Sequence, residues 1–312
     1  MSRTKPQIRG YKNSRYDYRI GVYRQKRSKL NYILPSMFVM VIVLAGLTGY
    51  SYLNKKVVVL SQDTNDKPAQ QANVSSSFKE QVYQVREDQD LAKKIKKQID
   101  YMPKSTEWSV TVRDLNTGRM ANINSDKLYD GGSISDLFLV PGLEKRISSD
   151  NWRYNLGGGT IRDCVVDMLK NDNPKCRKLI TNYTGYPKIG GAIAESGFKS
   201  VKIDESNKQI STSDTAEMLY RLQTSKILSD KARRAVFDAL YEQKQRSGVP
   251  VVCRGVSKCL VANIAEEKDS YKNDAAIVTN DKSKYVVVMM SKNTSWKQIN
   301  QLTSFIDREM NP

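Results

Sequence analysis

A serine that follows two glycines and opens an apolar run has the setting of a nucleophile at the start of a helix. The stretch reads "YDGGSISDLFLV" over residues 129–140, and its first serine is Ser133. A serine hydroxyl becomes a good nucleophile only when a neighbouring base takes its proton. The residue three positions on, which would share a helical face with it, is Asp136. These two residues form a candidate catalytic pair, and the alternative role for Ser133 is a helix N-cap.

The composition restricts what could activate such a serine. None of the 312 residues is a histidine, which excludes Ser-His-Asp and Cys-His catalysis and any histidine-ligated metal site. A nucleophile in this chain needs a lysine, a carboxylate or water as its base. The four cysteines include no C-x-x-C spacing, which argues against zinc. We therefore expect neither a metal nor a cofactor.

The beginning of the chain predicts a membrane anchor. Residues 1–31 form a basic tail with ten cations and one anion, and residues 32–53 carry no charged side chain. A helix of roughly 20 apolar residues crosses a bilayer, and a basic flank favours the cytoplasmic side. We expect a single-pass protein of the cell membrane with its N-terminus in the cytoplasm and its C-terminal domain outside. A buried core helix and a cleaved signal peptide are the alternatives.

The basic tail also indicates a partner. The formal net charge of the chain is +18, and half of this excess lies in the tail. Its tyrosines alternate with arginines, a pattern that could stack on nucleic-acid bases. A topology signal that rests on anionic lipid headgroups is the simpler interpretation. The expected partner of the tail is therefore the membrane and not nucleic acid.

The rest of the chain divides into a linker and one domain. Residues 54–77 are rich in polar and small side chains, which predicts a flexible linker, and residues 78–312 form the extracytoplasmic domain. Its periodicity predicts strands near both ends and helices between them. The expected fold is α+β, an antiparallel sheet covered by N- and C-terminal helices beside a helical subdomain. The predicted helices cover residues 78–102, 160–183, 211–222, 230–241 and 295–310, and the predicted strands lie within residues 107–124, 273–280 and 283–292.

Four cysteines in an exported domain predict disulfides. Local pairing joins Cys164 to Cys176 and Cys253 to Cys259, because each pair closes a short loop. Other pairings stay open at this point.

The order of these segments resembles the penicillin-recognising serine enzymes, in particular the class A β-lactamase-like branch. The resemblance covers roughly residues 91–310 and implies a β-lactamase/transpeptidase-like fold. The family carries three signatures, S-x-x-K, S-D-N and K-T-G. The segments that correspond to them are "SVTVRDLNTGRMANINSDKLYDGGSISDLFLV", "TIRDCVVDMLKNDNPKCRKLI" and "GVSKCLVANIAEEKDSYKNDAAIV".

The resemblance assigns family roles to nine positions, of which few keep the family's residue type. The first signature has Asp136 in place of its lysine, and the second has Asn171 in place of its serine. Nothing of K-T-G remains, and Glu205 is the candidate for the family's deacylating acid. The implied catalytic positions are Ser133, Asp136, Asn171 and Asn173, and the implied binding-cleft positions are Asp172, Ile264, Ala265 and Glu266.

These replacements predict a pseudoenzyme. A carboxylate beside a developing oxyanion raises the barrier that a lysine would lower. The cleft also loses two cations and gains two anions, Asp136 and Glu266, so it should repel an acidic acyl donor. We expect a degenerate serine hydrolase fold that binds a cell-wall component or an envelope protein of a bacterium. The alternatives are an active β-lactamase or peptidase that uses Ser133 with an atypical base, and a purely structural surface protein.

Overall fold

The structure is a computed structural model, and it describes residues 84–147, 151–224 and 226–311. The predicted tail, membrane segment and linker lie outside these ranges. Among the helices within them, none has both the length and the apolar character needed to cross a bilayer.

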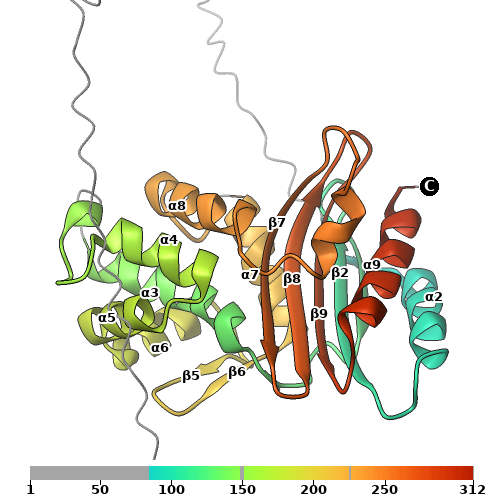
Figure 1. Ribbon diagram of the computed structural model, residues 1–312, viewed down its shortest axis with the longest axis horizontal. Helices are drawn as coiled ribbons and strands as arrows, with labels where there is room; N and C mark the ends of the chain where they lie inside the picture. Colours follow the sequence, from blue (N-terminus) through green and yellow to red (C-terminus); the bar gives the residue numbers. More distant parts are fainter. Residues whose placement is uncertain (1–83, 148–150, 225, 312) are drawn as a thin grey trace, which may run out of the picture. The chain divides into compact units, whose positions relative to one another are not determined.

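A six-stranded sheet forms the centre of the described domain (Figure 1). Its order is β1-β3-β2-β9-β8-β7, and all neighbours are antiparallel except β1 with β3. The predicted hairpin and the predicted final strand pair are confirmed. Because β2 pairs with β9, with Val110 opposite Met289, the two ends of the domain meet in the middle of the sheet. The strands are β1 (Arg86–Glu87), β2 (Glu107–Asp114), β3 (Arg119–Ile123), β7 (Leu260–Lys268), β8 (Tyr271–Thr279) and β9 (Lys284–Lys292).

Two terminal helices cover one face of this sheet, as the sequence predicted (Figure 1). Helix α2 (Gln89–Asp100) and helix α9 (Trp296–Met310) pack together and bury an apolar layer against the strands. Helix α9 begins with a capping box between Ser295 and Gln298. Helix α2 begins later than predicted, because Asp88 accepts a hydrogen bond from the Leu91 N–H and ends the preceding strand.

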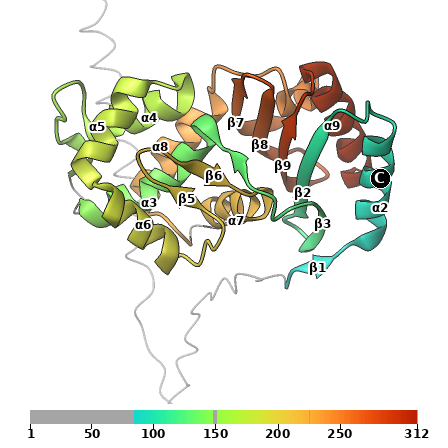
Figure 2. The same ribbon diagram turned by 90° about the horizontal axis from the view of Figure 1, so that it is seen from below.

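The other helices form the second half of the domain, on the far side of the sheet from α2 and α9 (Figure 2). Helix α7 packs on β2 and β9, and the apolar core beneath it continues into the helical subdomain. The predicted helices begin at Thr160, Ser211 and Ser229, whose side chains cap the first backbone N–H groups. The helices are α3 (Leu139–Arg146), α4 (Ile161–Asn171), α5 (Pro174–Thr184), α6 (Tyr186–Glu195), α7 (Thr212–Gln223) and α8 (Asp230–Tyr241).

Short elements connect the two halves. A small sheet of order β4-β6-β5 combines β4 (Tyr129–Asp130), β5 (Lys202–Ile203) and β6 (Lys208–Ile210). The connecting segments also contain the 3-10 helices η2 (Gly132–Phe138), η3 (Asn151–Arg153) and η4 (Val249–Cys253). The α+β class and its covering helices are therefore as predicted.

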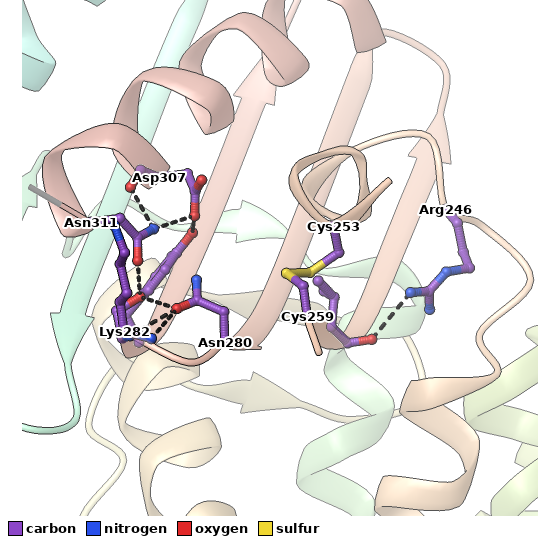
Figure 3. Close-up of a disulfide and its surroundings, with 10 residues drawn as sticks. Arg246, Cys253, Cys259, Asn280, Lys282, Asp307 and Asn311 are labelled. Atoms are coloured by element: carbon purple, nitrogen blue, oxygen red, sulfur yellow. Dashed lines mark hydrogen bonds between the residues drawn. A yellow bond between two sulfur atoms is a disulfide. The ribbon is translucent and has the colours of Figure 1, made fainter. Parts of the chain in front are cut away.

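The disulfide prediction is half right. Cys253 and Cys259 form a disulfide that joins η4 to the start of β7 (Figure 3). Cys164 and Cys176 meet across the α4–α5 corner, but as free buried thiols whose Sγ atoms lie 2.6 Å apart. The second predicted disulfide is therefore not formed in the structure, although the two sulfur atoms are adjacent. Burial raises the pKa of the Cys176 thiol to about 12, because a thiolate is poorly solvated at this corner.

Candidate active site

Ser133 lies in η2, where both of its polar groups are already bonded to β7. Its backbone N–H donates to Oε2 of Glu266 at 2.9 Å, and its hydroxyl donates to the Ala265 carbonyl at 3.1 Å. The side chain is buried, with 2% of its surface exposed. The N-cap alternative is wrong, because η2 begins at Gly132 without a side-chain cap and α3 begins only after Phe138. The serine instead fastens the 3-10 helix to the sheet edge.

Glu266 reaches Ser133 over a glycine. Gly132 has a φ of +49°, and a Cβ at this position would lie 2.4 Å from Cγ and Cδ of Glu266. A residue with a side chain would therefore clash with the glutamate and strain the backbone. In serine hydrolases the N–H of the nucleophile is one of the donors that stabilise the oxyanion. Here the Glu266 carboxylate accepts from that donor, so a negative charge already lies where the oxyanion of the transition state would form.

Asp136 is fully buried and belongs to an ion pair. Arg177 of α5 donates to it from Nε at 2.8 and 2.9 Å and from Nη2 at 2.6 Å. The same guanidinium also donates to Asp172. Burial raises the pKa of Asp136 to about 6, although the Arg177 hydrogen bonds and charge act in the opposite direction. Among the described residues no hydrogen bond joins Asp136 to Ser133, so this carboxylate is a structural partner of Arg177.

Arg177 is the residue that sequence reasoning missed. The sequence predicted that Asp136 would add an unpaired negative charge to the cleft, and this is wrong because Arg177 neutralises it. A buried carboxylate requires a cationic or hydrogen-bonding partner, so the apolar run that directly follows Asp136 in the sequence was the available signal. The partner itself lies 41 residues away and belongs to no motif.

A cleft of about 490 Å³ opens beside Ser133. Lys268 pairs with Asp130 at 3.1 Å, and Arg177 pairs with Asp172. Glu205 and Glu266 have no cationic partner within the described part of the chain, so carboxylates outnumber cations in the cleft. The charged residues that line it are Asp130, Asp172, Arg177, Glu205, Lys208, Glu266 and Lys268.

The second signature divides between the cleft and the corner behind it. Asp172 has left-handed backbone conformation, with φ +54°, and turns the chain between α4 and α5 into the cleft lining. Asn171 and Asn173 both donate their side-chain amides to Asp167, and Asn173 also caps α5. Neither asparagine lines the Ser133 cleft. The structure therefore brings only Asp172 of these three to the serine.

The third signature contributes a surface and no cation. Ile264 is fully buried in the apolar core, and Ala265 offers its backbone carbonyl to Ser133. Glu266 alone projects a charged side chain into the cleft. Strand β7 thus presents an acceptor and a carboxylate to Ser133.

Comparisons with known proteins agree with this fold. The family model of the β-lactamase enzyme family matches residues 157–308. The structure of PBP-A superposes with a TM-score of 0.62 at 17% identity, covering 72% of this chain and 97% of that one. The described domain is β-lactamase-like. No curated protein matches the sequence of the chain.

Two further structures place the β-lactamase-like domain in the same fold. A class A β-lactamase from Clostridium kluyveri DSM 555 gives a TM-score of 0.62 at 15% identity, covering 72% of this chain and all of that one. A β-lactamase from Sphaerobacter thermophilus DSM 20745 gives 0.60 at 13% identity, covering 70% and 96%. The serine hydrolase fold that the motifs predicted is therefore confirmed, on a chain whose three signatures have changed.

Proposed function

We propose that this chain is a membrane-anchored protein whose β-lactamase-like domain is catalytically inactive and acts by binding at the outer face of the cell membrane. The observation that carries the proposal is the bonding of Ser133. Its N–H donates to Glu266 and its hydroxyl donates to the Ala265 carbonyl, so neither group is directed at a substrate. An acyl transfer needs the first as an oxyanion donor and the second as a nucleophile.

The charge of Glu266 adds to this barrier. Two unit charges of the same sign that lie 4 Å apart repel by about 4 kcal/mol at an effective dielectric constant of 20. The loss of one oxyanion donor costs about 3–4 kcal/mol in serine hydrolases. A base is also lacking at the serine, because Arg177 holds the Asp136 carboxylate. Each of these effects opposes acylation on its own.

The anchoring and the partner class are part of the proposal. The uncharged segment over residues 32–53 follows a basic tail, which supports a signal anchor with the tail in the cytoplasm. A folded domain of this kind outside the membrane meets cell-wall components and other envelope proteins. We propose one of these as its ligand.

The test of inactivity is covalent labelling of the full-length chain in detergent. A reactive β-lactam and a fluorophosphonate are added separately, and adduct mass is read by intact-protein mass spectrometry. An active class A β-lactamase serves as the positive control, and the Ser133→Ala variant serves as the matched control. We expect no adduct on a protein that melts cooperatively. An adduct on the wild type that disappears in Ser133→Ala would overturn the proposal and assign a serine hydrolase.

The partner class and topology have their own measurements. Co-sedimentation with isolated peptidoglycan supports a cell-wall ligand if the chain pellets, and it removes that ligand if the chain stays in the supernatant. Protease added to intact protoplasts should digest the C-terminal domain and spare the tail. Digestion of the tail alone would contradict the proposed orientation.

A further inference from the structure

A second hollow lies at the start of β7, beside the Cys253–Cys259 disulfide. We call it the disulfide-loop pocket, and it has a volume of about 600 Å³. It shares no lining residue with the Ser133 cleft. Figure 3 shows Arg246 next to the two cysteines, with its guanidinium directed toward the strand. The lining residues that matter below are Tyr241, Arg246, Pro250, Arg254, Leu260 and Val261.

Exposed apolar side chains gather around this pocket. Of the six large apolar side chains that are exposed in the described residues, Tyr241, Val256 and Leu260 lie here, with 44, 52 and 56% of their surfaces exposed. Val256 belongs to the loop that the disulfide closes. Single exposed apolar residues are ordinary on protein surfaces, whereas a group of them beside a hollow is typical of an interaction site.

Two arginines of the pocket form no ion pair in the described part of the chain, although the buried Asp274 carboxylate acts on Arg246 electrostatically. Arg246 donates from Nη1 to the Tyr241 carbonyl and to Asn263 Oδ1, both at 3.1 Å, and from Nη2 to the Val261 carbonyl at 3.2 Å. An arginine has five N–H donors, so two of them remain, and a carboxylate accepts two. Arg254 donates only to the backbone carbonyl of Arg246, at 3.4 Å.

The pocket is also held in place before any ligand arrives. Three hydrogen bonds fix the guanidinium of Arg246, and the disulfide closes the loop between η4 and β7. Helix α9 supports η4 from the other side. A site that is ordered in advance loses little conformational entropy on binding, which favours a small, specific contact.

We propose that the disulfide-loop pocket binds a segment of a protein partner that presents a carboxylate next to an aromatic or aliphatic side chain. The carboxylate pairs with the two remaining donors of Arg246, and Arg254 adds positive charge at the rim. The apolar side chain packs between Tyr241 and Leu260. Aromatic residues and arginine are the side chains that most often carry binding energy in protein interfaces.

The geometry favours such a segment over a lipid surface. Lipid headgroups form a flat layer, which binds side chains that protrude from a protein surface. Arg246 is instead half-buried and is held inward by its three acceptors. Because the pocket lies apart from the Ser133 cleft, the proposal holds whether or not the serine reacts.

The test uses the full-length chain in detergent and ligand-observed saturation-transfer NMR. The probe is 4-phenylbutyrate, which carries a ring and a carboxylate, and its matched controls are 4-phenylbutanamide, 4-phenylbutylamine and butyrate. A probe of this size should bind with about millimolar affinity. We expect the signal order phenylbutyrate first, the amide well below it, and the amine and butyrate at background.

Variants locate the binding. Arg246→Gln should weaken phenylbutyrate about tenfold or more, because a charge-assisted bidentate contact is lost. Arg254→Gln and Leu260→Ser, both at exposed positions, should weaken it about threefold and test the pocket even if Arg246→Gln misfolds. Arg153→Gln, at an exposed arginine elsewhere, is the matched control and should leave binding unchanged.

Three results would overturn the proposal. The first is equal transfer to the acid and the amide, which would remove the role of the arginines. The second is binding that survives all three pocket variants. The third is stronger transfer to a short-chain phosphatidylglycerol that the same variants abolish, which would assign the pocket to lipid headgroups.

Discussion

Two regions of the domain differ in how their buried side chains are held. One is the sheet with its two covering helices, and the other is the Ser133 cleft. Between the sheet and α9, side chains such as Val287 and Ile306 are buried without polar partners and pack by shape alone. Beside the cleft, two buried polar residues are held by partners that lie far away in sequence. Ser133 binds Glu266 across 133 positions, and Asp136 binds Arg177 across 41. Apolar burial therefore tolerates exchange of residues, while polar burial depends on named pairs.

The largest effect should come from breaking the buried ion pair of the cleft. Arg177→Ala leaves the Asp136 carboxylate without its partner, and loss of one member of a buried pair costs about 3–5 kcal/mol. The free energy of unfolding from urea denaturation measures this change. The matched control is Arg162→Ala, whose pair with Asp238 is exposed, and it should cost about 0–1 kcal/mol. Equal losses of unfolding free energy in the two variants would show that the buried pair stabilises the domain no more than an exposed pair does.

The glycine beneath Glu266 should give the next largest effect. Gly132→Ala places a Cβ against the glutamate and forces alanine into a positive φ, at a cost of about 2–3 kcal/mol. In the Glu266→Ala background the clash is gone, so the further cost of Gly132→Ala falls to the backbone strain of about 1–2 kcal/mol. A double-mutant cycle on the free energy of unfolding measures the coupling. Additive losses would mean that Glu266 does not pack on Gly132.

Removal of the disulfide tests how strongly the start of β7 is held, and β7 is the strand that belongs to the sheet and also borders the cleft. Cys253→Ser/Cys259→Ser opens a loop of seven residues, and the entropy model predicts a loss of about 2 kcal/mol. A reductant should destabilise the wild type by a similar amount, measured by thermal unfolding. The double variant should be insensitive to reductant, because Cys164 and Cys176 are thiols. A reductant effect in the double variant would reveal a further disulfide.

Stability should also depend on pH, with one contributor from each region. Burial raises the pKa of Asp136 in the cleft to about 6 and that of Asp274 in β8 to about 7. Between pH 4 and 7 the folded state then binds more protons than the unfolded state, whose carboxyls titrate near 3.9. The contribution of these two groups to the free energy of unfolding is therefore complete below about pH 4. It falls as pH rises, by up to ~1.4 kcal/mol per pH unit and group.

Substitution separates the two contributors. Urea denaturation of Asp274→Asn across pH 4–8 should lose the part of the slope that extends to about pH 7 and keep the part that ends near pH 6. An unchanged slope in this variant would place the titration elsewhere.

The sequence predicted what depends on local patterns. Apolar patterns located β2, β8 and β9, and the helix starts predicted at residues 160, 211, 230 and 295 lie within one residue of α4, α7, α8 and α9. The family resemblance located Ser133, Asp172 and Glu266, and all three line one cleft.

The bonding of the site could not be predicted in the same way. Arg177 belongs to no signature and reaches Asp136 only because the α4–α5 corner folds back over η2. The side chains of Asn171 and Asn173 turn toward Asp167, which lies on α4 and has no place in the motif. A hydrogen-bond partner is selected by distance in space, and a sequence pattern specifies distance along the chain.

The Arg177 guanidinium also decides what surroundings a lysine at position 136 would have. A lysine at position 136 would recreate the first family signature, but it would be buried beside Arg177, with only the Asp172 carboxylate left to balance two cations. A lysine at position 136 therefore requires an earlier substitution of Arg177. That substitution alone leaves the buried Asp136 carboxylate without its cationic partner. Glu266 would still accept from the Ser133 N–H until it too was replaced. Each order of substitutions toward the family signature thus passes through at least one destabilised variant.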